Sequence, residues 1–422
     1  MRTVFAFPLA VALAAAMGTA ALAEAPSAPS GPSSDSPRLA ALVDRAWSID
    51  RQGGIEAARA AELDARALAN RAFFAGAPVV GFDVRRDLPR GAGLPGTDTV
   101  SERGRNELEP GVSAPIWLPG QREAQRRLIE REREALSTAT RLERLRLAGQ
   151  VREAAWAVAL SQGVRRLQQA RLDAARGLEK DVERRVAAGD LAPVDLMLAR
   201  AERLAAEAAQ LEADATTAAA RAGLRRLTGA DAAGDLLESP AAPTPLQSHP
   251  ALAAAREAAE ASRARLDYAR ATRRDNPSVS AVARFDRDGY GTGYRNTLRV
   301  GIAIPLDTEA RNAPRLAAAS ADLTEAEIAL DRRQREVAAD IERARIGFDA
   351  QRTALEAQVE RARVAREAQA AIERAFRAGE RGLPELLRLR AQTFEAEFAR
   401  DTARERLGLA IARLNQAQGI EP

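Results

Sequence analysis

The sequence predicts a mixed α/β membrane protein that is mainly α-helical, with long antiparallel helical hairpins and four β-strands. The first observation is an internal repeat. The stretch "VERRVAAGDLAPVDLMLARAE" at 182–202 aligns without a gap to "IERAFRAGERGLPELLRLRAQ" at 372–392, at an offset of 190 residues. The second is a composition typical of long helices, with 29% charged and only 4% aromatic residues. The third is an alternation of apolar and polar residues ahead of each repeated turn.

Residues 1–23 have the pattern of a secretory signal peptide, which is not expected to belong to the fold. Arg2 gives a positive start, an apolar stretch follows, and 21–23 is a small-residue cleavage site. The apolar stretch is short and is interrupted by Pro8 and Gly18, which disfavours a permanent membrane anchor. The sequence contains no cysteine, so neither disulfides nor a lipid anchor on a cysteine are expected.

The first repeat, at 24–230, is expected to hold a helix, two strands and a long hairpin over about 120–229. No proline interrupts 121–187, and a helix of that length would be about 100 Å long. Ala188-Gly189 ends the predicted helix, because glycine is the typical residue just past a helix C-terminus. Pro193 suits the first turn of a returning helix. The pattern therefore predicts an antiparallel hairpin.

A Pro-rich linker at 231–250 leads to a second repeat at 251–418, which is expected to follow the same order. Its long hairpin is predicted over about 314–415, with the turn at Ala378-Gly379 and the return helix opening at Pro384. Two copies are too few for a solenoid, so the sequence indicates an internal duplication of one helix–strand–hairpin unit.

Four strands are predicted where apolar residues occupy every second position, at about 78–87, 108–118, 277–287 and 296–306. About ten alternating residues is the length of a tilted strand that crosses a bilayer. Aromatic residues gather at the strand ends, as in the interfacial girdles of membrane barrels; they are Phe73, Phe74, Trp117, Tyr290 and Tyr294. The positions expected to face lipid are Val80, Phe82, Val112, Ile116, Val300, Ile302 and Ile304.

Four strands are too few to close a barrel, and open strand edges cannot lie in lipid. The chain must therefore complete a barrel with further copies of itself, and three copies would supply twelve strands. On the strands alone, two soluble hairpins with one buried face each remain the alternative.

No catalytic or metal-binding constellation is expected. His249 is the only histidine, and one histidine makes neither a metal site nor a catalytic dyad. Met197 is the only methionine outside the signal peptide, so a pathway of soft metal ligands is not expected. The glycines at 289–293 are not followed by a helix, which excludes a dinucleotide-binding motif. Neither an enzyme nor a cofactor is predicted.

Basic and acidic residues are nearly balanced, at 63 Lys and Arg against 59 Asp and Glu, for a net charge of +4. Arg and Glu are interleaved along the predicted helices, as in "REREALSTATRLERLRLAGQ" at 131–150. Such mixing is typical of solvated helix faces rather than of a phosphate-binding stripe, so nucleic acid is not an expected partner.

An exported chain that repeats a helix, a strand pair and a long helical hairpin resembles the TolC family of outer-membrane efflux factors. The resemblance covers essentially the whole chain after the signal peptide. The motifs that carry it are the A-G-[D/E] turns at 188–190 and 378–380 and the G-x-x-x-P strand ends at 111–115 and 301–305. It implies a homotrimer in the lipid of the cell outer membrane, with a 12-stranded barrel and a coiled-coil tunnel that extends into the periplasm.

The same resemblance implies a passive conduit in a tripartite efflux system. The expected partners are a periplasmic adaptor (membrane fusion) protein and an inner-membrane pump of the RND type. The stretch "APIWLPGQREAQRR" at 114–127 is similar to family members that accompany heavy-metal pumps, so metal cations are the expected substrate. The alternative from another class is a periplasmic helical-hairpin adaptor, which would need only one hairpin set between β-rich domains.

The two hairpin turns are expected to be the tips that dock the adaptor, because they are small, exposed and farthest from the predicted strands. Their residues are Ala188, Gly189, Asp190, Ala378, Gly379 and Glu380. The alternative is that Gly189 and Gly379 only end their helices, and the two interpretations are compatible.

The resemblance also implies a gate. In the family, an acid six residues after the first tip glycine pairs with an arginine two residues after the second, and Asp195 and Arg381 match these positions. Glu385 matches an acid of the aperture, whereas the next aperture acid is replaced here by Arg388. The family also uses a tyrosine hydroxyl where this chain has Phe376.

Overall fold

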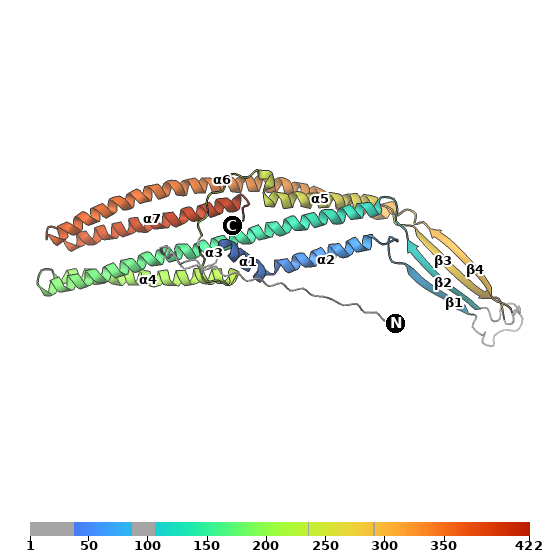
Figure 1. The fold of residues 1–422 in the computed structure, drawn as a ribbon, viewed down its shortest axis with the longest axis horizontal. Coiled ribbons are helices and arrows are strands. Elements are labelled where there is room, and N and C mark those ends of the chain that lie inside the picture. Colours follow the sequence, from blue (N-terminus) through green and yellow to red (C-terminus); the bar gives the residue numbers. More distant parts are fainter. Residues whose placement is uncertain (1–37, 87–105, 235, 290–291) are drawn as a thin grey trace, which may run out of the picture.

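The protein is an elongated rod that carries a small sheet at one end (Figure 1). The computed structural model describes the chain in four stretches, residues 38–86, 106–234, 236–289 and 292–422. The signal peptide expected at 1–23 and the girdle residue Tyr290 lie outside these stretches.

Helices account for most of the described chain. They are α1 (Leu39–Asp50), α2 (Gln52–Asn70), α3 (Gln121–Ala187), α4 (Pro193–Thr228), α5 (Pro250–Ala271), α6 (Thr308–Arg377) and α7 (Leu383–Ala417). The strands are β1 (Val79–Arg86), β2 (Asn106–Pro115), β3 (Ser278–Arg287) and β4 (Arg295–Ala303). They form an antiparallel sheet in the order β1-β2-β3-β4, so β1 and β4 are the edges.

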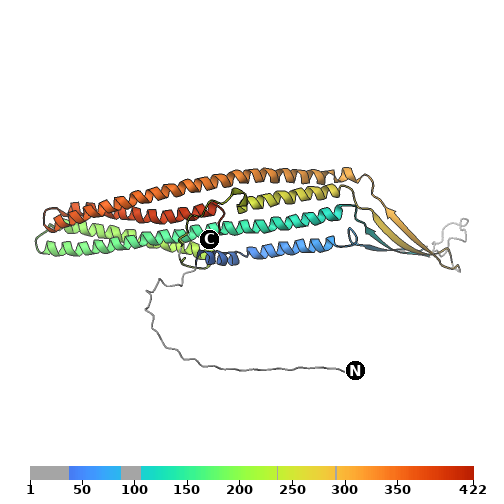
Figure 2. The same ribbon diagram turned by 45° about the horizontal axis from the view of Figure 1, so that its top comes forward.

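Two helices run the whole length of the rod, as Figures 1 and 2 show. These are α3, with 67 residues, and α6, with 70. The returning helices α4 and α7, with 36 and 35 residues, cover only the half of the rod that is distant from the sheet. In the other half α2 packs on α3, and α5 packs on both α3 and α6. The duplicated unit therefore gives four helices side by side along both halves.

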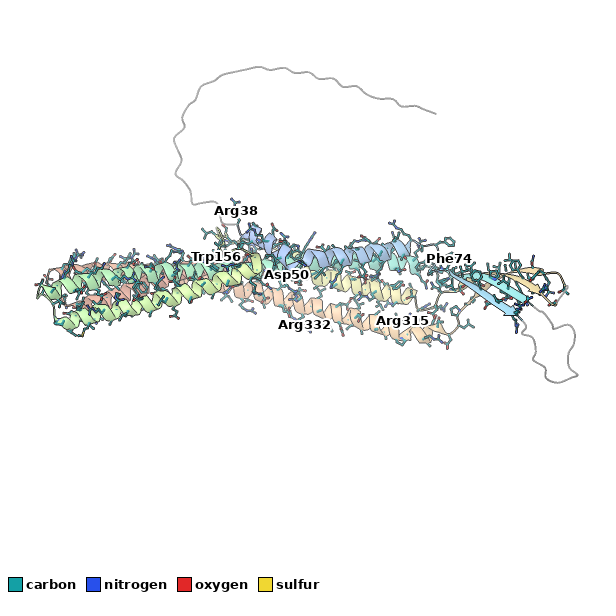
Figure 3. The ribbon with its side chains drawn as sticks, turned by 90° about the horizontal axis from the view of Figure 1, so that it is seen from below. Arg38, Asp50, Phe74, Trp156, Arg315 and Arg332 are labelled. Carbon is teal, nitrogen blue, oxygen red and sulfur yellow. The ribbon has the colours of Figure 1, made fainter. Side chains whose placement is uncertain are left out.

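The main hydrophobic core lies at the middle of the rod, between the half that contains α4 and α7 and the half that contains α2 and α5. It joins residues of α1, α3, α4 and α7 around Trp156, which is buried in mid-rod (Figure 3). Gly408 of α7 lies directly against the Trp156 ring, and a Cβ added there would overlap it. The two hairpins thus pack closely because the large Trp156 ring of one lies against Gly408 of the other, which has no side chain.

A buried polar network lies beside this core. Arg152 of α3 donates to both carboxylate oxygens of Glu238 in the linker, at 2.9 and 2.8 Å, and to Ile420 O at 2.9 Å. It also donates to Gln416 of α7 at 2.6 Å. Asn415 holds the linker as well, since its side chain donates to Glu238 and accepts from the backbone N–H of Ala241. The network therefore ties the linker and the C-terminal end of α7 to the middle of α3.

The start of the second long helix differs from the sequence prediction. A start at about residue 314 was expected, but α6 begins at Thr308 and includes Pro314. Contacts with the chain after α5 stabilise the extra turns: Thr308 accepts from the backbone N–H of Asp275, and Asn312 donates to the Asp275 carboxylate at 2.9 Å. These tertiary hydrogen bonds outweigh the cost of a proline near the helix start.

Two strands also end earlier than the sequence predicts. Strands were expected to reach 118 and 306, but β2 ends at Pro115 and β4 at Ala303. Past β2, the Ile116 N–H still bonds to Pro277 O, and the Leu118 N–H then turns to the Gln121 side chain at the start of α3. Near β4, Pro305 has no N–H to continue the ladder. The expected lipid-facing residues Ile116 and Ile304 therefore lie just beyond the strands, and Ile116 is half-buried.

The single histidine caps a helix. His249 Nδ1 accepts from the backbone N–H of Ala251 at 3.1 Å in the first turn of α5, and its other ring nitrogen lies 3.2 Å from Ala417 O. A carbonyl can only accept, so the ring is neutral with its proton on Nε2. Burial lowers the pKa of His249, with Ala417 O and the charges of Arg333 and Asp340 on α6 as further influences.

We expect this cap to make the protein less stable in acid. Since the folded-state pKa of His249 lies below its ordinary value of about 6.5, the unfolded chain binds the proton more readily. The His249 contribution is therefore complete above pH of about 6.5 and is lost as the pH falls towards the folded pKa. Melting temperatures at about pH 7.5 and 5.5 measure the loss. His249→Asn keeps a capping oxygen without a titrating group, so it should melt with a weaker pH dependence; an unchanged dependence would exclude His249 as its source.

Candidate functional site

The observed register gathers most of the apolar residues of the four strands on one face of the sheet, here called the apolar face. Val80 pairs with Val112, Val112 with Ala281, and Ala281 with Val300, so these residues form one row across the sheet. Alternate residues of a strand share a face. The other apolar members of the face are Phe82, Val84, Leu108, Pro110, Ala114, Val279, Ala283, Phe285, Leu298 and Ile302.

The apolar face has no covering layer within the described chain. Val300 is 75% exposed, and Phe82, Val84, Leu298 and Ile302 are also exposed. Five of the seven residues expected to face lipid lie on this face; they are Val80, Phe82, Val112, Val300 and Ile302. A broad uncovered apolar surface of this kind marks an interaction with a membrane or a partner.

The opposite face, here called the charged face, carries a network of ion pairs. Arg284 of β3 lies between Glu107 and Glu109 of β2, and Asp286 pairs with Arg295 of β4 at 2.7 Å. Asp286 is only 2% exposed. Towards the helices the same face carries mostly small residues, at Gly81, Gly111, Ser113, Ser280 and Gly301, together with Val79, Val282 and Arg299. A sheet that is apolar on one side and charged on the other has the residue pattern of a barrel wall between lipid and water.

Sequence reasoning missed the charged face, although a signal exists. Glu107 and Glu109, like Arg284 and Asp286, are charged at alternate positions, out of step with the apolar residues. The opposite signs could have been paired only once the β2–β3 register was known, because a shift by one residue would exchange the faces.

Aromatic residues lie where the helices meet the sheet. Phe73 and Phe74 form an edge-to-face pair with ring centroids 4.9 Å apart, and Figure 3 shows Phe74 at this junction. Trp117 Nε1–H donates to Ala72 O at 3.2 Å. An apolar ring with a hydrogen-bonded polar end suits a membrane–water boundary.

Both hairpin turns have the same helix-ending geometry. Gly189 and Gly379 have φ values of +83° and +77°, in the left-handed region that glycine adopts without strain. The Gly189 N–H bonds to Val186 O and the Asp190 N–H to Arg185 O, and the corresponding two bonds are present at Gly379 and Glu380. This pair of bonds defines a Schellman motif. The six expected tip residues are all exposed, at the end of the rod opposite the sheet (Figure 1).

The two tips are packed against each other by a hydrophobic cluster that includes Leu178, Val182, Ile372, Phe376, Leu383 and Leu386. Phe376, which stands where the family has tyrosine, is buried in this cluster. The Arg185 guanidinium lies over its ring, 5.0 Å from the centroid. The side chain thus joins the two hairpins by packing rather than by a hydroxyl hydrogen bond.

The expected gate residues lie near the tips but are not all brought together. Asp195 accepts from the backbone N–H of Ala192 at 3.1 Å, which stabilises the first turn of α4. Arg381 pairs with Glu385 at 3.3 Å within the start of α7. Arg388 is exposed and makes no ion pair within the described chain. In one protomer, therefore, Asp195 and Arg381 each have a partner in their own hairpin, and no ion pair joins them.

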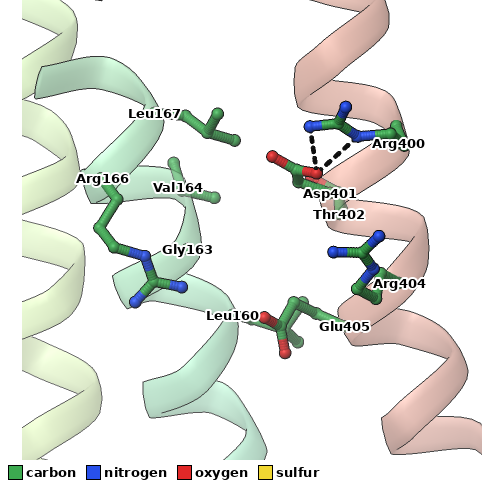
Figure 4. A pocket seen from close by; sticks show the side chains of 10 residues that line it. All are labelled: Leu160, Gly163, Val164, Arg166, Leu167, Arg400, Asp401, Thr402, Arg404 and Glu405. Carbon is green, nitrogen blue, oxygen red and sulfur yellow. Dashed lines mark hydrogen bonds and ion pairs between the residues drawn. The ribbon is translucent and has the colours of Figure 1, made fainter. Parts of the chain in front are cut away.

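A shallow groove separates α3 from α7 in the distal half of the rod (Figure 4). It is lined by Leu160, Gly163, Val164, Arg166, Leu167, Arg400, Asp401, Thr402, Arg404 and Glu405. Arg400 pairs with Asp401 at 2.7 Å, and burial raises the pKa of the Glu405 carboxyl. Sequence patterns did not predict this groove, because it depends on which faces of two helices far apart in the chain meet.

The described residues contain no cluster of three or more His, Cys, Asp or Glu arranged to hold a metal ion. Within the same residues, no helix combines the length and the apolarity needed to cross a membrane.

A long helical rod ending in a four-stranded sheet with one apolar face is the architecture of outer-membrane channels. Similar solved structures include VceC from Vibrio cholerae, with a TM-score of 0.70 and 17% identity over 90% of this chain and 96% of that one. The open state of the MtrE outer membrane channel of Neisseria gonorrhoeae has a TM-score of 0.71 and 18% identity, over 91% and 89%.

The family model described as outer membrane efflux protein matches residues 55–230 and 243–419. The chain belongs to this family, which confirms the resemblance stated from the sequence and, with the observed helices and strands, the mainly helical fold class. The curated relative CzcC, a cobalt-zinc-cadmium resistance protein of Cupriavidus metallidurans, is 33% identical over 214 residues, 48% of this chain and 50% of the relative. The match thus spans about half the length of that relative.

Proposed function

We propose that the protein is the outer-membrane channel of a tripartite efflux system, a passive homotrimeric conduit without catalytic activity. The observation that carries the proposal is the sheet, with an apolar face, a charged face and two open edges, β1 and β4. Open edges in lipid leave backbone groups unpaired, so β4 of one copy should pair with β1 of the next. Three copies close a barrel of twelve strands over a tunnel of helices.

The proposal assigns a separate role to each part of the chain. The two repeats, at 24–230 and 251–418 with the linker between them, would each contribute two strands to the barrel and one hairpin to the tunnel. The apolar face would contact outer-membrane lipid and the charged face would line the water-filled lumen. The signal peptide at 1–23 would direct export.

We further propose a heavy-metal cation as the transported substrate, with a periplasmic adaptor and an RND-type pump as partners. The support is the similarity to CzcC, whose name refers to cobalt, zinc and cadmium resistance. A passive duct needs no dedicated metal ligands, so the substrate would be chosen by the pump. Growth of a deletion strain on each of the three metals tests this part of the proposal, and unchanged tolerance to all three would contradict it.

Membrane fractionation and conductance test the channel itself. The protein should sediment with the outer membrane, extract in detergent as a trimer, and open discrete conductances in a planar lipid bilayer. A soluble periplasmic protein without conductance would instead indicate the helical-hairpin adaptor. Two complete hairpins with alternating strand pairs favour the channel.

Bulky residues at the tips should block efflux without unfolding the protein. Gly189 and Gly379 are poor test positions, because their positive φ values strain any side chain. Ala188 and Ala378 have ordinary helical φ values of −78° and −77° and are exposed. Ala188→Trp combined with Ala378→Trp should give a normally conducting trimer that no longer supports metal tolerance. If tolerance is retained, the tips do not dock the adaptor.

Removing the charge of Asp195 should raise the resting conductance, if the residue latches the tunnel to Arg381 of a neighbouring copy. Asp195→Asn is the suitable change, because asparagine can still accept the Ala192 N–H bond that caps α4. Exposed ion pairs contribute about 0–1 kcal/mol each, so three copies bias the gate by at most about 3 kcal/mol. Arg381→Gln should have a similar effect with little addition in the double variant. Single-channel currents equal to those of the parent in both variants would rule out the latch.

A further inference from the structure

The apolar face ends in a row of polar residues at the end of the sheet that is distant from the helices. In the register Arg86 pairs with Asn106, and Asn106 with Arg287. Tyr294 comes directly before β4, and the Arg287 guanidinium lies over its ring, 5.3 Å from the centroid. We call these four residues the rim row.

The rim row belongs to the apolar face and not to the charged face. Arg86 is two residues beyond Val84, and Arg287 two residues beyond Phe285, so the side chains point to the same side of the sheet. Arg85, one residue away on the same strand, points to the charged face and lies opposite Glu107 there. On the charged face the arginines of β3 and β4 are paired with carboxylates. Two of the four residues of the rim row are arginines.

The height of the rim row matches a lipid headgroup layer. From Val279 to Phe285 the apolar face spans about 20 Å along the strand, at about 3.3 Å per residue. Strands of membrane barrels tilt by about 35–45°, so this length corresponds to about 15 Å of height within an apolar band of about 25 Å, and the rim row lies near the edge of that band. The arginines lie about 7 Å further along the strands, where a long side chain can place its guanidinium among headgroups while its stem covers apolar surface.

We propose that the rim row binds the phosphate groups of membrane lipids in the leaflet at this end of the barrel. Guanidinium groups bind phosphate oxygens in a bidentate manner, and a tyrosine at the same level supplies an amphipathic ring suited to the interface. Arg86 is exposed and available to such a ligand, and stacking on Tyr294 orients Arg287. Three copies place six arginines around the barrel. The inference rests on the proposed function, because it requires the apolar face to contact lipid.

Native mass spectrometry of the detergent-purified trimer tests the proposal. Titration with phosphatidylglycerol, whose headgroup is anionic, is compared with titration with zwitterionic phosphatidylcholine. The parent should retain phosphatidylglycerol preferentially. Arg86→Gln and Arg287→Gln should each weaken that binding by about fivefold, and the double variant more. Arg85→Gln is the matched control, since it removes an arginine from the same height of the charged face, and its lipid binding should equal that of the parent.

Three outcomes overturn the proposal: unchanged lipid retention by the double variant, an equal loss in Arg85→Gln, or displacement of the lipid by inorganic phosphate alone. The trimer content and planar-bilayer conductance of every variant are measured alongside. If all variants form conducting trimers but show no headgroup preference, the rim site is wrong and the channel stands. If the parent itself neither trimerises nor conducts, the proposed function fails first.

Discussion

Replacing Arg152 with methionine is expected to cost about 3–5 kcal/mol of stability, since it leaves the Glu238 carboxylate without its partner. Arg152 is 2% exposed, and the side chain of Glu238 is 15% exposed, so water cannot fully take the place of the guanidinium. The loss should appear as a much lower melting temperature of the trimer and as early proteolysis in the linker. The physical reason is that one buried cation holds α3, the linker and the end of α7 together.

An exposed ion pair between the same two helices provides the control. Arg413 of α7 pairs with Glu153 of α3 at 2.6 Å, but both side chains are at least half exposed. Arg413→Met should therefore cost less than about 1 kcal/mol. The double variant Arg152→Met/Glu238→Leu should recover much of the loss, because it removes both buried charges. Equal melting temperatures for Arg152→Met and Arg413→Met would show that the buried network does not hold the hairpins together.

Local signals in the sequence were sufficient for the hairpins and for most of the sheet. Gly189 and Gly379 end their helices through backbone bonds to residues three to five positions earlier, so neighbouring residues determine the turn. The strands could be predicted because a strand with one face in a core or in lipid alternates apolar and polar residues along the sequence. The strand ends were less visible, because Ile116 and Ile304 continue the alternation past the points where the ladder stops.

Distant contacts could not be predicted in the same way. In the sequence, nothing near Arg152 distinguishes it from the other arginines of α3, because its partners are 86 and 264 residues away in the chain. The start of α6 depends on Asp275 and Arg273 after α5, which outweigh the local signal of Pro314. The gate positions were taken from a family resemblance, and within the protomer Asp195 and Arg381 bond to residues of their own hairpins.

Arginine in the middle of the apolar face should prevent stable assembly in the membrane. Ile302 lies in the row of the apolar face nearest the helices, and Val300 lies one row closer to the centre of the face. Val300→Arg should cost about 2–4 kcal/mol per protomer, because a charge on the lipid side is most unfavourable at the bilayer midplane. Ile302→Arg should cost less, since the penalty falls towards the interface.

Thr297→Arg on the same strand is the matched control, because Thr297 lies on the charged face that would line the lumen. Thr297→Arg should destabilise the protein only by repulsion from the neighbouring Arg284, which amounts to about 1 kcal/mol or less. The readouts are the amount of trimer in the outer membrane and its heat resistance in detergent. We expect the loss of trimer to be largest for Val300→Arg, smaller for Ile302→Arg and smallest for Thr297→Arg. This order follows from which face contacts lipid and how deep in the bilayer each residue lies. A Val300→Arg protein that inserts and trimerises like the parent, or a Thr297→Arg protein that suffers more, would mean that the apolar face does not contact lipid.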